Sequence, residues 1–204
     1  MILYKLSKIL HKLHRISKSI RYNSIVIKIL GEFFRMTMKW QQDKEYLELI
    51  EDLIDHEDVQ RLESFVHHKV TNRLAHSLSV SYSSFCWARR LKLDTRAIAR
   101  AGLLHDLFFY EGITKHEVGG KGHNYEHPRI ALENALKITE LSDLEQDIIL
   151  KHMCGSTLDI PKYAESVIVT LMDKQCAVLE VSNGMVSFLS RKLKKASVFA
   201  SQMI

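Results

Sequence analysis

The sequence has few of the residues that break regular secondary structure, with 8 Gly and 2 Pro among 204 residues. A fold of many short strands uses such residues at each hairpin, so their scarcity disfavours an all-β architecture. Hydrophobic residues make up 46% of the chain and charged residues 26%. Because that composition is typical of globular proteins and not of disordered ones, we expect a folded, mostly helical protein.

Cysteine is also scarce, and Cys86, Cys154 and Cys176 lie far apart without any paired spacing. This pattern excludes a thiolate zinc cluster and favours buried free thiols, which suit a reducing cytoplasm. No apolar run approaches the roughly 18 residues that a membrane-spanning helix needs. The N-terminus also lacks a compact apolar stretch followed by a small-residue cleavage site. We therefore expect a cytoplasmic protein.

Acidic residues are nearly missing from the first 40 positions, which contain nine basic residues and one acid, Glu32. The net charge of +5 therefore belongs to this segment, and the remainder of the chain is slightly acidic. Because the basic charge is confined to the first 40 residues, the rest of the chain is not predicted to carry a nucleic-acid-binding face. We expect no specific nucleic-acid partner.

Residues 2–21 place apolar side chains at intervals of three and four, with basic residues on the opposite face, and this predicts an amphipathic helix. We predict a basic helical extension over residues 1–42 and one domain over residues 43–204. The apolar face of the extension would pack on the domain or on a second subunit, or would rest on an anionic membrane surface. Packing is favoured because the sequence shows no second membrane anchor.

Further helices are predicted by apolar periodicity and by capping residues at Glu45–Ile54, Thr71–Leu91, Thr95–Leu107, Pro128–Lys137, Ser142–His152 and Lys162–Val181. Asp94 and Ser142 are expected to cap two of them. The stretch Tyr110–Glu126 is rich in glycine and is predicted to be a loop. Ser182-Asn183-Gly184 is predicted to end the last of these helices, and a basic C-terminal helix should follow.

The chain contains 11 histidines, and several of them lie in apolar helical segments together with two aspartates. The residues in this setting are His76, His105, His152, Asp106 and Asp173. One such histidine is usually a core residue, but a buried carboxylate is costly unless it is paired. Arg73 or Lys174 would be one source of a partner. A divalent cation held by imidazoles and carboxylates would satisfy all five groups together.

The order of these residues resembles that of the HD-domain superfamily. His76 is followed by the pair His105-Asp106 in ARAGLLHD and then by Asp173 within a distant helix. His127 and His152 stand between the pair and the last aspartate, as in the HD-GYP and bacterial diadenosine-tetraphosphate hydrolase branches. The resemblance is strongest over residues 65–182. It implies an all-α fold, an HD-domain helical bundle, that carries the basic N-terminal extension.

The resemblance also implies a metal centre. One metal would be held by His76, His105, Asp106 and Asp173, and a second would share Asp106 and take His127 and His152. Two divalent ions such as iron or manganese are expected. The implied reaction is hydrolysis of a phosphate ester or anhydride, in a nucleotide-like small molecule, by a metal-bound hydroxide. The segment HDLFFYEG and the lack of a Gly-Tyr-Pro sequence depart from the HD-GYP pattern, so cyclic-dinucleotide hydrolysis is not expected.

Three further residues are candidates for contact with the substrate. Arg73 lies one turn before His76 on the same helix face, which makes it a candidate for phosphate binding and catalysis. Lys121 and His123 follow the glycine-rich stretch and would close over the substrate, or His123 would add a metal ligand.

Two alternative functions come from other classes. Some di-iron HD proteins are oxygenases with a similar ligand set, and such a protein would consume O₂ with an organic substrate. A catalytically silent binding module is the other alternative, and the complete set of metal-binding residues argues against it. Phosphate release, oxygen uptake and metal analysis discriminate among the three.

Overall fold

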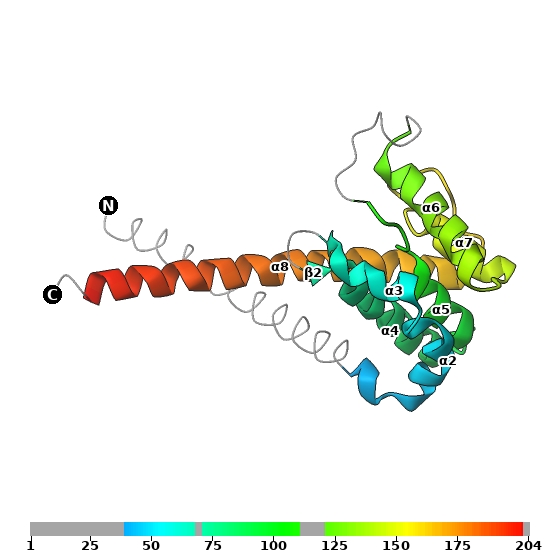
Figure 1. Ribbon diagram of the computed structural model, residues 1–204, viewed down its shortest axis with the longest axis horizontal. Coiled ribbons are helices and arrows are strands. Elements are labelled where there is room, and N and C mark those ends of the chain that lie inside the picture. Colours follow the sequence, from blue (N-terminus) through cyan, green and yellow to red (C-terminus); the bar gives the residue numbers. More distant parts are fainter. Residues whose placement is uncertain (1–38, 68–70, 111–120, 202–204) are drawn as a thin grey trace, which may run out of the picture. The chain divides into compact units, whose positions relative to one another are not determined.

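The computed structural model describes residues 39–67, 71–110 and 121–201 (Figure 1). The predicted helix at 2–21 and nearly all of the predicted extension over residues 1–42 lie outside these ranges. The extension, its boundary and its proposed contacts with a membrane or a second subunit therefore stay predictions. Most of the predicted loop at Tyr110–Glu126 lies outside the described residues as well.

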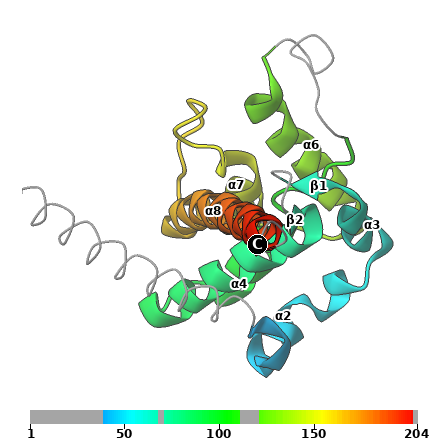
Figure 2. The same ribbon diagram turned by 90° about the vertical axis from the view of Figure 1, so that its left-hand side faces the viewer.

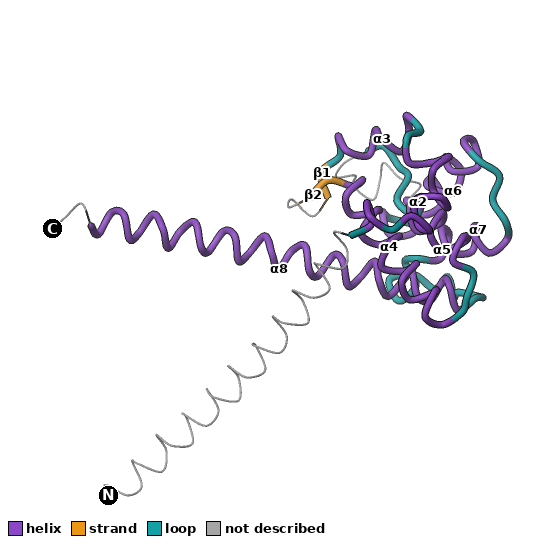
Figure 3. The backbone as a smooth tube through the Cα atoms, turned by 90° about the horizontal axis from the view of Figure 1, so that it is seen from below, coloured by secondary structure: helices purple, strands orange, loops and turns teal. Residues whose placement is uncertain are grey.

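Helices account for most of the described residues, which confirms the prediction of an all-α fold (Figure 3). In chain order they are the short turn η1 (Trp40–Gln42), α2 (Lys44–Ile54), α3 (Glu57–Arg61), η2 (Leu62–Ser64), α4 (Arg73–Leu91), α5 (Thr95–Leu104), α6 (His123–Ile138), α7 (Asp143–Lys151) and α8 (Ala164–Ser201). Two short strands, β1 (Val66–His67) and β2 (Thr71–Asn72), form an antiparallel pair just before α4. Among the described helices, none is both long enough and apolar enough to span a bilayer.

Side-chain caps fix where several of these helices begin. The carboxylate of Asp94 accepts a hydrogen bond from the backbone N–H of Ala97 at 2.9 Å, as predicted. Ser142 and Glu145 form the predicted capping box, in which each side chain accepts from the other residue's backbone N–H. Such caps satisfy backbone donors that have no partner within the helix. They therefore position α5 and α7, whose C-terminal ends carry His105 and His152.

The core lies where α4 packs against α5 and α8, and α7 packs against α5, α6 and α8. Figure 2 shows α8 beside both α4 and α7. The helices α4 and α5 come close together at Gly102, where an added Cβ would lie 2.9 Å from the Cα of Ser81. Small side chains on this side of α4, including the buried Ser77 and Ser81, allow the two backbones to come together. The contact places the end of α5, and so His105, beside α4.

Replacing Gly102 with alanine is expected to destabilise the domain by about 1–3 kcal/mol, because the new methyl group would overlap a backbone atom that cannot rotate away. Urea-induced unfolding followed by circular dichroism measures this change. Arg96→Ala, at an exposed position of the same helix, is the control and should have a small effect. A Gly102→Ala protein as stable as the wild type would contradict the close packing of α4 on α5.

A buried arginine joins three segments that surround the centre of the domain. Arg100, on α5, pairs with Asp52 of α2 and donates to the Thr139 hydroxyl at 2.8 Å. Its Nε also lies 3.3 Å from the Glu145 carboxylate on α7. A buried charge is tolerated when it is paired in this way. These contacts link α7 to α5 independently of their apolar packing.

The start of α6 differs from the prediction, because the helix begins at His123 and contains Pro128 within it. Proline cannot donate a backbone hydrogen bond, which normally favours a place in the first turn. Here side-chain donors supplement the turn before the proline. His127 donates to the His123 carbonyl at 2.8 Å, and Arg129 donates to the Tyr125 carbonyl at 2.6 Å.

The end of α8 was also predicted wrongly, because the helix continues through Ser182-Asn183-Gly184 to Ser201. The hydroxyl of Ser182 donates to the Val178 carbonyl at 2.7 Å, one turn earlier. A serine that bonds back to its own helix does not compete with the helical backbone as a capping serine does. One glycine in a helix costs only about 1 kcal/mol relative to alanine, which is too little to end it.

Candidate metal centre

Six side chains meet in the interior of the helical domain. His76 lies in the first turn of α4, the pair His105-Asp106 follows α5, and the remaining members come from α6, the end of α7 and the middle of α8: His127, His152 and Asp173. Five of the six residues are buried, and the Asp173 side chain is 14% exposed. They are the six residues that the sequence predicted as metal ligands.

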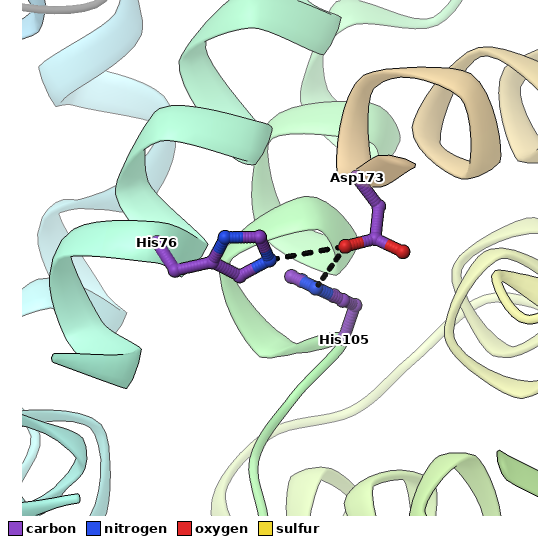
Figure 4. A group of neighbouring side chains, drawn as sticks. All are labelled: His76, His105 and Asp173. Atoms are coloured by element: carbon purple, nitrogen blue, oxygen red, sulfur yellow. Dashed lines mark hydrogen bonds and ion pairs between the residues drawn. The ribbon is translucent and has the colours of Figure 1, made fainter. Parts of the chain in front are cut away.

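One half of this cluster consists of His76, His105 and Asp173 (Figure 4). The Asp173 carboxylate points between the two imidazoles, with one oxygen 3.0 Å from the Nε2 of His76 and 3.8 Å from the Nε2 of His105. Donor atoms from α4, from the turn that follows α5 and from α8 therefore face a common point. Helices hold such donors more precisely than loops do.

The other half of the cluster is organised around Asp106. Its Oδ1 lies 3.4 Å from the Nε2 of His127 and 3.6 Å from the Nε2 of His152, while its Oδ2 lies 3.7 Å from the Nε2 of His105. His105, Asp106 and His152 form a second group able to hold a metal ion. His105 belongs to both groups, whereas the sequence predicted that Asp106 would be shared. The two oxygens of Asp106 nonetheless face opposite halves, which is the arrangement that a bridging carboxylate requires.

Backbone carbonyls fix the proton positions on three of the histidines. The Nδ1 atoms of His105, His127 and His152 lie 2.7–2.8 Å from the carbonyl oxygens of Gly102, His123 and Ile149. A carbonyl oxygen can only accept a hydrogen bond, so each Nδ1 carries the proton. In the neutral ring, each Nε2 then presents a lone pair to the cluster, which is the state that binds metals.

In the half of the cluster around Asp106, several lone pairs face one another with no hydrogen-bond donor from the described part of the chain between them. The Nε2 atoms of His127 and His152 face each other at 2.9 Å beside Oδ1 of Asp106. Within the described residues, Oδ1 of Asp106 and Nε2 of His105 are buried and have no hydrogen-bond partner. Lone pairs this close repel one another unless a positive charge lies among them. The donor set, imidazole nitrogens and carboxylate oxygens, is one that suits iron, manganese or zinc.

In the half of the cluster around Asp106, the ionisation of His152 and Asp106 favours a cation over additional protons. Burial, together with the neighbouring His105 and His127, lowers the pKa of His152 to about 3. Burial alone would raise the pKa of Asp106, but the surrounding histidines outweigh it and hold that pKa well below its usual range. His152 is therefore neutral and Asp106 charged at neutral pH. Both are in the form that ligates a metal. His76 differs, because burial alone would lower its pKa but its hydrogen bonds with Asp173 and Glu180 outweigh burial and raise that pKa to about 10, so a metal ion there would displace a proton.

Comparison with protein families agrees with this geometry. The family model described as HD domain matches residues 73–177, which is about half of the chain. This chain belongs to the HD-domain family. No curated protein and no solved structure gave a match. The matched span begins three residues before His76 and ends just after Asp173, so it contains all six residues of the cluster.

In this HD domain, Arg73 contacts the backbone of the segment that follows the His105-Asp106 pair. Its guanidinium donates to the carbonyls of Phe108 and Tyr110, and its Cζ lies 3.6 Å from the centre of the Phe108 ring. The residue is 4% exposed. These contacts place Arg73 as a clamp on residues 108–110. Its predicted roles in phosphate binding and catalysis are not tested by them and stay predictions.

Replacing Arg73 with lysine is expected to cost about 1–3 kcal/mol of stability, because an ammonium group cannot donate to two carbonyls from one plane or stack on Phe108. Urea unfolding measures the loss. The control is Arg61→Lys, because Arg61 is exposed and its Cζ also lies near an aromatic ring, 4.5 Å from the centre of Phe109. Unchanged stability together with a raised KM for a phosphate substrate would assign Arg73 to the substrate.

The other two predicted substrate residues lie outside the cluster of six. His123 is exposed and stacks on His127, with ring centres 4.5 Å apart, so it borders the cluster. Lys121 is exposed and donates to the Tyr125 hydroxyl at 3.2 Å. Neither contact tests a role in substrate binding.

Sequence reasoning missed two residues that shape the site. Glu180 accepts a hydrogen bond from Nδ1 of His76 at 3.0 Å. Phe108, 3% exposed, lies against His127 with ring centres 5.2 Å apart and covers that side of the cluster. The position of Glu180, about two helical turns after Asp173, was a usable signal, because both acids then lie on one face of α8. Nothing in the sequence distinguished Phe108 from Phe109.

Proposed function

We propose that this HD domain binds two divalent metal ions and hydrolyses a phosphate ester or anhydride in a nucleotide-like small molecule. The observation that carries the proposal is the group formed by His127, His152 and Asp106. Its buried lone pairs meet within 2.9–3.6 Å and need a cation between them. The group His76, His105 and Asp173 would hold the other ion.

The charge balance of the centre supports an anionic substrate. With two divalent ions bound, the four imidazoles would be neutral ligands and two carboxylates would compensate only part of the metal charge, so a positive excess would remain for phosphate oxygens. The bound metals would supply Lewis acidity and lower the pKa of a water molecule from about 15.7 towards 7. A phosphate ester needs both effects, because its oxygens repel an attacking nucleophile.

The residues of the chain orient this chemistry. The carbonyls of Gly102, His123 and Ile149 hold three imidazole rings through their Nδ1–H groups. Asp106 spans the two halves with its two oxygens. The buried ring of Phe108 lies against His127, and a bulky apolar side chain there would keep water from that side and strengthen electrostatic interactions in the site.

Aromatic rings beside the cluster support a nucleotide-like substrate. Tyr110, which is partly exposed, and His123, which is exposed, lie with ring centres 5.8 Å apart next to His127. Burial raises the pKa of Tyr110 to about 12, so its ring is neutral at physiological pH. Neutral aromatic rings are suitable surfaces for stacking of a nucleobase.

A phosphate-release screen tests the proposal. Protein reconstituted with Mn²⁺ is incubated with nucleoside mono-, di- and triphosphates and with dinucleoside polyphosphates, and inorganic phosphate and nucleotide products are measured. We expect metal-dependent hydrolysis of at least one class, abolished by a chelator and restored by Mn²⁺. Oxygen uptake without phosphate release would favour the oxygenase, and binding of nucleotide without turnover of any kind would favour the silent module.

A further inference from the structure

Glu180 is a largely buried acid that is not among the six proposed metal ligands. Its side chain is 16% exposed, and its Oε1 lies 3.0 Å from Nδ1 of His76. Its Oε2 is buried and has no hydrogen-bond partner among the described residues. A carboxylate with one oxygen left unpaired is costly to bury, so the contact with His76 must compensate for part of that cost.

The two edges of the His76 ring are occupied by carboxylates from the same helix. Nε2 faces Asp173 at 3.0 Å, and Nδ1 faces Glu180 at 3.0 Å. Both acids lie on α8, about two turns apart, and hold the ring between them. The edge at Asp173 faces the metal-binding group, whereas the edge at Glu180 faces away from it.

We propose that Glu180 is the positioning residue of His76, accepting its Nδ1–H so that Nε2 is presented to the metal. The inference rests on the proposed metal centre. The other three histidines of the cluster use backbone carbonyls for the same purpose, whereas His76 uses a charged acceptor. A carboxylate polarises the ring more strongly than a carbonyl and makes the opposite nitrogen a stronger ligand. Glu180 therefore contributes to metal affinity without touching the metal.

The test compares the Mn²⁺ affinity of the wild type with that of Glu180→Gln and Glu180→Ala. The glutamine keeps an oxygen that accepts from Nδ1–H but loses the charge, whereas the alanine loses both. Loss of such a partner typically costs about 10–100-fold in metal affinity. We expect the affinity to fall about tenfold in Glu180→Gln and further in Glu180→Ala, as measured by competition with a fluorescent chelator on the full chain.

Glu165→Gln is a matched control, because it places the same substitution on α8 at another acid that accepts a hydrogen bond. Glu165 is 9% exposed and accepts from the backbone N–H of Asp94 at 3.2 Å, away from the cluster. This variant should keep the wild-type Mn²⁺ affinity, whatever its melting temperature. A residue with only a structural role would lower the melting temperature and leave the affinity of the folded protein unchanged.

A second readout reports on His76 itself. In Zn²⁺-loaded protein labelled with ¹⁵N-histidine, one ring N–H signal should shift, relative to the wild type, in both Glu180 variants and stay in place in Glu165→Gln. Unchanged affinity and unchanged ring signals in folded Glu180 variants would overturn this inference while leaving the metal centre intact. A wild-type protein that binds no Mn²⁺ would instead overturn the metal centre itself.

Discussion

Replacing Asp106 with asparagine is expected to remove metal binding and hydrolysis together while the protein stays folded. Its two oxygens face His105 on one side and His127 and His152 on the other, so the loss of its charge weakens both halves at once. Metal catalysis contributes several kcal/mol of transition-state stabilisation, so we expect activity to fall by about 10³-fold or more.

The same substitution should not destabilise the metal-free protein. The asparagine amide has the shape of the carboxylate and donates hydrogen bonds to the ring nitrogens, which otherwise face one another as acceptors. Elemental analysis, phosphate release and the melting temperature of Asp106→Asn together measure the effect.

Asp147→Asn is the control for this prediction. Asp147 is also buried and accepts from the Ser166 hydroxyl at 2.7 Å, but it belongs to the packing of α7 on α8 and not to the cluster. The control should lose stability and keep its metal. Asp106→Asn protein that retains both metal and activity would show that Asp106 is not a shared ligand.

Addition of Mn²⁺ to metal-free protein is expected to raise its melting temperature by about 8–16 °C. A ligand that binds only the folded state at about 1,000 times its dissociation constant stabilises by about 4 kcal/mol. In a domain of this size, each kcal/mol raises the melting temperature by about 2–4 °C. The physical source is the cluster itself, because a cation replaces repulsion among buried lone pairs with attraction.

Differential scanning calorimetry of chelator-treated protein, with and without Mn²⁺, measures this shift. Asp106→Asn should show less than half of it, and a second addition of chelator should reverse it. A shift below about 2 °C in the wild type, at Mn²⁺ concentrations that saturate any bound metal, would mean that the six residues do not form a cation site.

The parts of this structure that local sequence determines were predictable. Asp94 and Ser142 are caps whose partners lie three residues away, and the apolar periodicity of α4, α5 and α7 extends over several turns. The cluster of six was predictable only as a set, because its order along the chain resembles a known family. No spacing by itself shows that His76 and Asp173 lie 3.0 Å apart.

The features that were missed depend on contacts between distant segments. The guanidinium of Arg73 contacts the Phe108 and Tyr110 carbonyls because the start of α4 lies beside the segment that follows α5, which no local pattern records. The helix α8 passes through Gly184 although glycine usually marks an end, because the local preference against helix is small. Glu180 is functional only through His76, whose position comes from the packing of α4 on α8.

The number of metal ions bound per chain distinguishes a dinuclear centre from a mononuclear one. Metal-free wild type and His152→Ala are dialysed to equilibrium against Mn²⁺, and metal and protein are quantified in each. We expect about two ions per chain in the wild type and about one in His152→Ala, because His76, His105 and Asp173 remain to hold the other. At most one ion in the wild type, with the same number in His152→Ala, would contradict a dinuclear centre built from these six residues.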